Sequence, residues 1–386
     1  MTWSGTSLMD LRAQFAAEAA SGLFSMTELC ERYGISRKTG YKWEKRYDGG
    51  GRPACADASR APKSHPNETP PEMVEQILEL RRKLGWGAVA LRKRLQTLHP
   101  DVAWPSASTI GEVLKRNGEI TPRRRRRPRT AWNPDRTRAD APNRVWTADF
   151  KGEFRLRNGQ LCYPLTILDG YSRYLLQCRG LKSTAAAPAR SGFEAAFREF
   201  GLPEVIHTDN GVPFGAPSSV LGLSKLSVWL LKLGIRLERS RRGKPQDNGR
   251  HERMHRTLKA AACRTPRASH SAQQRALNEF RTIYNEERPH RALELETPAS
   301  YYTPSERCYP DEIPDPVYPG HFELRRVTKI GVFSWYRHQI FVSQAFHNET
   351  LGLECTADGV WSVFFGEFLL GRFSEENYEF TAGSAR

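Results

Sequence analysis

The sequence lacks the features of membrane, secreted and disulfide-built proteins. Its 386 residues contain no run of about 18 apolar residues, so no segment is predicted to cross a membrane. The seven cysteines are scattered and form no C-x-x-C pair, which predicts neither a disulfide framework nor a structural zinc site. The start, MTWSGTSLMDLRAQ, has no charged region followed by an apolar one, unlike a secretory signal. We therefore expect a cytoplasmic protein that does not bind membranes.

Acidic residues are outnumbered by basic ones everywhere except near the C-terminus. The formal net charge is +16, with +11 in residues 1–145, +10 in residues 146–310 and −5 in residues 311–386. An excess confined to the first two segments predicts that both face a polyanion such as DNA. A basic surface kept for solubility is the alternative, but it does not explain why the last segment reverses sign. The length predicts several domains.

The first 48 residues have the pattern of a helix-turn-helix domain. In MDLRAQFAAEAASG, apolar residues recur every fourth position until Gly22. In the following SMTELCERYGISRKTGYKWEKRY, Gly34 supplies a tight turn and Ser36 can cap a basic helix that starts at Arg37. An unrelated helical hairpin remains the alternative. The residues of this helix that we expect to contact DNA are Arg37, Lys38 and Lys42.

Two linkers flank a second helical segment. Residues 49–70 are rich in Gly, Pro, Ala and Ser and are predicted to be a linker. Residues 71–120 contain three helical patterns, which predict a second helix-turn-helix-like DNA-binding domain. Residues 121–142 form an arginine-rich linker that cannot fold on itself and is expected to lie along a DNA groove. Its expected DNA contacts are Arg123, Arg124, Arg125, Arg126 and Arg127.

The remaining chain changes from helical patterns to strands. Residues 143–290 begin with β-rich runs and then alternate strands with helices, which predicts an α/β core with a sheet of mixed strand direction. Residues 291–320 are dense in proline and form a connector. Residues 321–386 alternate apolar and polar residues between Gly turns, and we expect a small antiparallel β-barrel, with a sandwich as the alternative.

Three acidic residues of the predicted core stand where strands end or a helix begins. Asp149 lies in the strand VWTADF, Asp209 ends the strand VIHTD, and Glu252 starts the helix after GKPQDNG. Neighbouring strand ends converge on one crevice of an α/β sheet, so the three carboxylates can meet there. Acids gathered in this way repel one another unless a divalent cation binds, and oxygen ligands favour Mg²⁺ or Mn²⁺.

These residues stand in motifs that resemble a known family. DFKG, HTDNG, KPQDNGRHERMHRTLK and the trailing YNEERPHRAL resemble the DDE motif and trailer of bacterial insertion-sequence transposases and retroviral integrases. The resemblance covers roughly residues 143–302. Asp209 and Glu252 are 43 positions apart, longer than the usual interval, which an inserted loop within VPFGAPSSVLG would explain.

The resemblance implies an RNase H-like core that binds two Mg²⁺ ions, for which Mn²⁺ can substitute, through Asp149, Asp209 and Glu252. It implies cleavage of DNA at transposon ends and transfer of the freed 3′-OH into target DNA. It also implies at least a homodimer on DNA, in the bacterial cytoplasm and associated with the nucleoid when bound. A DNA-binding regulator that keeps this fold without chemistry is the rival interpretation.

The stretch GRHERMHRTLK is predicted to be an amphipathic helix. Glu252, His255, Arg256 and Lys259 fall on one face, and Met254, Leu258, Ala261 and Ala262 on the other. We expect His255, Arg256 and Lys259 to contact DNA beside the catalytic acid, with Lys259 implied by the resemblance. Asn210 can also touch DNA from the turn that aims Asp209.

HERMH within this helix also matches the zinc-peptidase signature H-E-x-x-H. We reject that interpretation because Gly243, Pro245 and Gly249 leave His251 at most one turn inside the helix, whereas zinc helices are usually buried. It would also leave the basic segments and both aspartates without a role.

Overall fold

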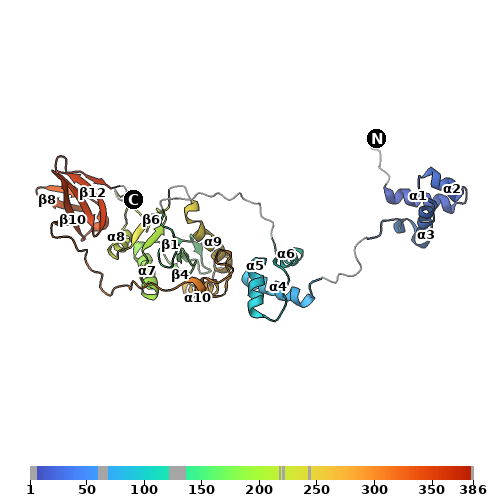
Figure 1. Ribbon diagram of the computed structural model, residues 1–386, viewed down its shortest axis with the longest axis horizontal. Helices are drawn as coiled ribbons and strands as arrows, with labels where there is room; N and C mark the ends of the chain where they lie inside the picture. Colours follow the sequence, from blue (N-terminus) through green and yellow to red (C-terminus); the bar gives the residue numbers. More distant parts are fainter. Residues whose placement is uncertain are drawn as a thin grey trace. The chain divides into compact units, whose positions relative to one another are not determined.

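The computed structural model describes residues 7–59, 68–120, 136–216, 219, 222–241 and 245–383. The chain divides into two compact units, Met1–Glu68 and Thr69–Arg386 (Figure 1). The predicted DNA contacts Arg123–Arg127 lie outside the described residues. Within the described ranges, none of the helices has the length and apolar character needed to cross a bilayer.

The first unit is the predicted helix-turn-helix. Its helices are α1 (Leu8–Ala20), α2 (Met26–Arg32) and α3 (Arg37–Ala54). Ser36 caps α3 by accepting a hydrogen bond from the backbone N–H of Thr39, and Phe15, Leu29 and Trp43 form the core. α3 continues beyond residue 48, where we expected the linker to begin, because a kink at Gly51, with φ of 61°, joins two helical pieces.

A second group of three helices opens the larger unit. It consists of α4 (Pro71–Leu84), α5 (Ala88–Leu98) and α6 (Ala107–Arg116), packed around buried apolar side chains from all three helices. Gly85 ends α4 in the left-handed conformation, and Ser106 caps α6. Arg94 and Lys93 on α5 pair with Glu287 and Glu296 of the core at 2.5 and 2.8 Å.

The core contains the mixed sheet that the sequence predicts. Its strands are β1 (Val145–Phe150), β2 (Phe154–Arg155), β3 (Leu161–Asp169), β4 (Leu175–Leu181), β5 (Val205–Thr208) and β6 (Arg236–Arg239). β4, β3 and β1 are antiparallel neighbours, whereas β5 and β6 continue the sheet parallel to β1. β2 pairs with the start of β3.

Helices cover both faces of this sheet (Figure 1). α7 (Ala186–Phe200) and α8 (Lys225–Lys232) pack on one face, and α9 (Gly249–Leu258) and α10 (His270–Thr282) on the other. Side chains alternate along a strand, so Ile167 joins the first cluster and Leu168 the second. π-helical turns follow α9 and α10, at Lys259–Cys263 and Ile283–Glu287. The described 3₁₀ turns are Pro245–Asn248, Arg291–Leu293, Pro298–Tyr301 and Gln344–Phe346.

The C-terminal part is all-β, but the expected closed barrel is not confirmed. Its strands are β7 (Glu323–Arg326), β8 (Val332–Trp335), β9 (His338–Phe341), β10 (Thr350–Ala357), β11 (Val360–Phe365), β12 (Phe368–Ser374) and β13 (Phe380–Ala382). In the described residues the sheet β13-β12-β11-β10-β7 is open, and β8–β9 is a separate hairpin. Apolar side chains of the hairpin and of the sheet form one cluster, so the core is buried without closure.

We predict that Phe197→Ala destabilises the core by about 3–5 kcal/mol, because its fully buried ring packs against Trp146 and Trp229 and its removal leaves a cavity. Differential scanning calorimetry of the full chain measures the loss. Phe341→Ala is the control, since that ring is 48% exposed and its truncation should cost less than about 0.5 kcal/mol. Equal effects of the two changes would contradict the central place of Phe197.

Candidate active site

The pairing of β1 with β5 brings two of the three predicted acids to neighbouring positions. The parallel register aligns Thr147 with His207. Asp149 and Asp209 each follow two residues later, at the carboxyl ends of strands that lie about 4.8 Å apart. The parallel pairing ends before these residues, and Asp209 lies in the turn after β5, near enough for its charge to act on Asp149. Asp149 retains 24% side-chain exposure, and Asp209 is exposed.

A tight turn after β5 holds Asp209. Its carboxylate accepts a hydrogen bond from the backbone N–H of Gly211 at 3.0 Å. A Cβ at position 211 would lie 3.2 Å from the carboxylate, so glycine gives the acid its space. Asn210 donates its side-chain N–H to the carbonyl of Ser240 at 2.6 Å. Asn210, which we expected to touch DNA, thus ties the turn to the end of β6.

Glu252 stands in the first turn of α9 and is exposed to solvent. Its charge acts on Asp149, more weakly than that of Asp209. Burial of Asp149 and then the charge of Asp209 raise the pKa of Asp149 to about 7, and Glu252 shifts it in the same direction. Burial and like charge outweigh the opposite effect of Lys151, and a bound divalent cation would remove the cost of such a shift. In the described residues, the potential metal ligands whose atoms lie within 4.8 Å of one another are those of Asp149, His251 and His255; Asp209 and Glu252 are not in this group.

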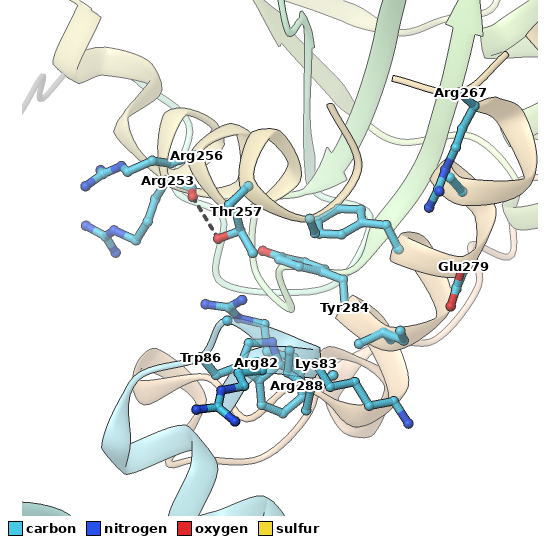
Figure 2. A pocket seen from close by; sticks show the side chains of 17 residues that line it. Arg82, Lys83, Trp86, Arg253, Arg256, Thr257, Arg267, Glu279, Tyr284 and Arg288 are labelled. Atoms are coloured by element: carbon cyan, nitrogen blue, oxygen red, sulfur yellow. Dashed lines mark hydrogen bonds between the residues drawn. The ribbon is translucent and has the colours of Figure 1, made fainter. Parts of the chain in front are cut away.

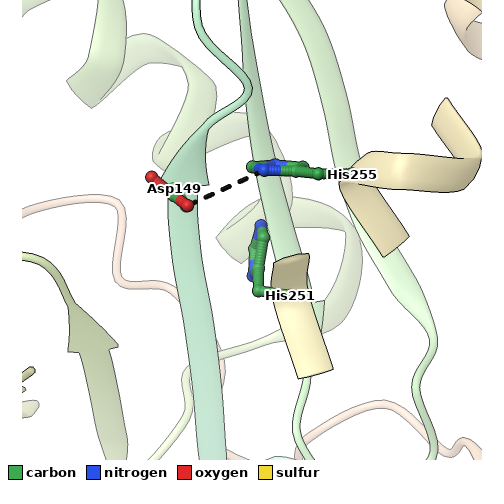
Figure 3. Close-up of side chains that lie close together, drawn as sticks. All are labelled: Asp149, His251 and His255. Atoms are coloured by element: carbon green, nitrogen blue, oxygen red, sulfur yellow. Dashed lines mark ion pairs between the residues drawn. The ribbon is translucent and has the colours of Figure 1, made fainter. Parts of the chain in front are cut away.

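Two buried histidines fasten α9 to the sheet (Figure 3). His251 is fully buried and bonds the hydroxyl of Thr147 through Nδ1 at 2.8 Å and that of Thr166 through Nε2 at 2.7 Å. His255 bonds the same Thr166 hydroxyl through Nε2 at 2.7 Å, and its Nδ1 lies 3.7 Å from Asp149 Oδ2. The histidines of HERMH therefore set the position of the helix that carries Glu252.

These contacts agree with rejection of the peptidase interpretation. A zinc helix needs a free nitrogen on each histidine, whereas both ring nitrogens of His251 are bonded to threonines. Burial lowers the pKa of His251 well below its ordinary value and lowers that of His255 to about 3, so both rings are neutral.

The two faces of α9 differ in part from the prediction. Glu252, Arg256 and Lys259 are exposed as expected. His255 is not, since only 9% of its side chain is accessible and it packs on the buried side with Met254. A buried neutral ring cannot pair with a DNA phosphate, so we withdraw His255 as a DNA contact. Ala261, expected to be buried, is exposed where the π-turn shifts the helical phase.

The predicted contacts of the first unit lie on one exposed helix. Arg37, Lys38 and Lys42 are all exposed on α3. The ammonium of Lys42 lies 4.9 Å from the centre of the Trp43 ring, and the Arg12 guanidinium lies 4.2 Å from it. The buried ring of Trp43 thus makes cation–π contacts with two basic side chains of this surface.

A basic pocket of about 610 Å³ lies between the end of α4 and helices α9 and α10 (Figure 2). Arg253 and Arg256 project together from α9 on one side, and Trp86 and Arg288 meet on the other, with the Arg288 guanidinium 5.7 Å from the Trp86 ring centre. Its charged lining residues are Arg82, Lys83, Arg253, Arg256, Arg267, Glu279 and Arg288.

Several residues of this region were not predicted from the sequence. Thr147 and Thr166 are ordinary strand threonines in the sequence, and only the docking of α9 gives them a role. The four-residue spacing of the histidines was the available signal, because it places both on one helix face. Arg253 was overlooked although it is next to Glu252, and Trp86 lies far away in the sequence.

Comparison with known families agrees with this architecture. Two models described as integrase core domains match residues 139–245 and 233–298. A model described as a helix-turn-helix domain matches residues 11–63, and one described as a homeodomain-like domain matches residues 39–114.

Individual relatives include viral and bacterial proteins. The Gag-Pol polyprotein of baboon endogenous virus is 28% identical over 186 residues, which cover 48% of this chain and 10% of the polyprotein. The chain thus spans about a tenth of that relative's length. The insertion element IS407 uncharacterized 31.7 kDa protein of Burkholderia multivorans is 25% identical over 243 residues, covering 61% of this chain and 82% of that protein. A chain of the simian T-cell lymphotropic virus intasome in complex with PP2A regulatory subunit B56 gamma is 16% identical with a TM-score of 0.37, covering 76% of this chain and 97% of the other.

Helix-turn-helix domains ahead of an integrase core define a protein of the polynucleotidyl transferase superfamily. The chain therefore carries an integrase core domain behind helix-turn-helix domains, and it is similar to an insertion-element protein and to viral polyproteins.

We predict that Thr166→Val weakens the attachment of α9. Valine keeps the shape of the side chain, but His251, His255 and the carbonyl of Asp149 lose their shared partner. Each buried polar group left unpaired costs about 1–3 kcal/mol. We expect the calorimetric transition of the core to fall by roughly 4 °C or more.

Thr166→Ser is the matched control, because it retains the hydroxyl and loses only the methyl group. It should remain closer to wild type than the valine variant. A valine variant as stable as the serine variant would show that the hydroxyl does not hold the helix.

Proposed function

We propose that this protein is a DNA transposase that cuts DNA at transposon ends and joins the freed 3′-OH to target DNA in a metal-dependent reaction. One observation carries the proposal. Asp149 and Asp209 each follow by two residues an aligned pair of two parallel strands, and Glu252 lies in the first turn of α9, the helix whose histidines contact the same sheet. The raised pKa of Asp149, to which Asp209 and Glu252 contribute after burial, supports the proposal that the three acids act together.

The three carboxylates would hold two Mg²⁺ ions, for which Mn²⁺ can substitute. Asp149 is the proposed shared ligand, with Asp209 completing one position and Glu252 the other. The ions would activate the attacking oxygen and stabilise the leaving one. The protein's own part is to fix the acids, through the Gly211 turn for Asp209 and the histidine–threonine contacts for α9.

The basic elements supply the proposed DNA surface. Arg256 lines the basic pocket beside α9, and Lys259 is exposed one turn further on. The helix-turn-helix contributes Arg37, Lys38 and Lys42. Phosphate contacts of this kind fix the position of a duplex, while a recognition helix reads its bases. Arg123–Arg127 remain proposed contacts in the linker between the helical and catalytic parts.

The domain division follows from these roles. Residues 1–54, which end with α3, and residues 71–120 are proposed to bind transposon ends. Residues 143–290 are proposed to catalyse the reaction. Residues 321–386, which follow the 291–320 connector, are proposed to contact protein or DNA. Holding two ends together requires at least a homodimer on DNA. The bound protein would be associated with the bacterial nucleoid.

We predict that Asp209→Asn abolishes Mg²⁺-dependent nicking of a DNA that carries the cognate ends, while binding of those ends is retained. The substitution removes one anionic ligand with little change in shape. The rate should fall by about 100-fold or more, the range seen when one electrostatic group at a reacting centre is lost. Gel electrophoresis of labelled ends measures nicking, and a mobility shift measures binding.

Asp358→Asn is the control, because that acid is exposed in a turn of the β domain. It should nick DNA as wild type does. If wild type and Asp209→Asn behave alike while both bind the ends, the enzyme proposal is wrong and the DNA-binding regulator is the better account.

We also predict that Arg256→Gln lowers the salt dependence of DNA binding. Each neutralised phosphate contributes about 0.9 to the slope of log affinity against log salt, so losing one contact should reduce the slope by about that amount. Fluorescence anisotropy between 50 and 200 mM salt, roughly the range over which such contacts weaken, measures it. Arg275→Gln, an exposed arginine on α10 outside the basic pocket, is the control for charge. Equal slopes for both variants would contradict a phosphate contact at Arg256.

A further inference from the structure

The hydrogen bonds around Thr166 fix where two protons lie. The Thr166 hydroxyl has one hydrogen, which it donates to the carbonyl oxygen of Asp149 at 2.9 Å. Its oxygen must therefore accept from both histidines, from Nε2–H of His251 and from Nε2–H of His255, each at 2.7 Å. Each ring thus carries a proton on Nε2, which leaves Nδ1 as the nitrogen through which a neutral ring can bind a metal.

The two Nδ1 atoms have different surroundings. The hydroxyl of Thr147 has one hydrogen, which goes to Nδ1 of His251 at 2.8 Å because the carbonyl of Leu168 is farther away at 3.4 Å, so both nitrogens of that ring are bonded. Nδ1 of His255 faces Asp149 Oδ2 at 3.7 Å, too far for a hydrogen bond. The two atoms are therefore close neighbours without a direct hydrogen bond, at a separation that a cation bound to both can span.

We propose that Nδ1 of His255 is a metal ligand which, with Oδ2 of Asp149, binds a divalent transition-metal cation such as Mn²⁺ or Zn²⁺. This inference rests on the proposed function, because Asp149 is also a proposed Mg²⁺ ligand. It adds a nitrogen to a site that the three acids alone would make entirely of oxygen.

The local geometry fits this role. Metal–nitrogen and metal–oxygen bonds to Zn²⁺ are about 2.0–2.2 Å long, so one ion can reach two atoms that lie 3.7 Å apart. A ligating histidine usually donates its other ring N–H to a fixed acceptor, which orients the ring, and Thr166 is that acceptor here. His251 belongs to the same group of potential ligands, whose atoms lie within 4.8 Å, but its nitrogens are both bonded.

A nitrogen ligand changes which metal the site prefers. Mg²⁺ selects oxygen ligands, whereas imidazole suits transition metals such as Zn²⁺. The chain should therefore bind Mn²⁺ and Zn²⁺ more tightly, relative to Mg²⁺, than a site of carboxylates alone. His255 would then determine which metal the site prefers, while Glu252 would remain a proposed catalytic ligand.

Electron spin-echo spectroscopy of Mn²⁺ tests this directly. One equivalent of Mn²⁺ alone is added to the metal-free full-length protein, and nitrogen modulation from a bound imidazole is recorded. We expect modulation in the wild type, its loss in His255→Gln, and its retention in His347→Gln, where the histidine is exposed in the β domain. Even residues that support a metal ligand change affinity by about 10- to 100-fold, so His255→Gln should weaken Mn²⁺ binding by at least about tenfold. Titration calorimetry should show a smaller change for Mg²⁺.

The wild type by itself can overturn the proposal, whether or not the variant folds. Bound Mn²⁺ without nitrogen modulation means that His255 is not a ligand, and modulation that persists in His255→Gln means the same. Nicking by a wild type that lacks modulation would remove this inference and leave the transposase proposal standing. Nitrogen modulation in a wild type that does not nick DNA would support His255 as a ligand and count against the transposase proposal.

Discussion

The hydroxyl group of Thr166 connects the helix that carries Glu252 to the two central strands of the core sheet. It donates to the backbone of Asp149 and accepts from two histidines of α9, so strand and helix are fixed relative to each other at one atom. An active site assembled from remote segments needs its ligands held to a fraction of an ångström, and buried hydrogen bonds without slack provide this. The position of α9, and with it that of Glu252, relative to Asp149 therefore depends on the hydrogen bonds of Thr166.

Electrostatics sets the second constraint. Asp149 is largely buried beside Asp209 and feels Glu252, which raises its pKa. Carboxylates gathered in this way repel one another, and a bound divalent cation removes that repulsion. Lys151 and Arg239 lie close enough to act on Asp149 and Asp209, whereas other arginines, on α9 and across the basic pocket, line a separate surface.

Much of this could be predicted because it is local. The cap at Ser36, the turn at Gly34 and the alternation of strands and helices follow from short-range chemistry, and the structure contains them. The β domain was harder, because alternation predicts strands but not whether a sheet closes. Here a hairpin covers the open sheet, and the packing of Phe333 and Trp335 on the sheet decides that outcome.

The sequence by itself determined the acidic motif, the segments that carry it and the amphipathic character of α9. It did not determine which side of α9 is buried at each position. Periodicity assigns His255 to the face of Glu252, but docking on β1 and β3 turns that ring inward, toward Thr166 and Asp149. Burial then lowers its pKa and makes it a neutral ring. Only the tertiary structure could decide this, because the charge of a histidine depends on its surroundings rather than on its place in the chain.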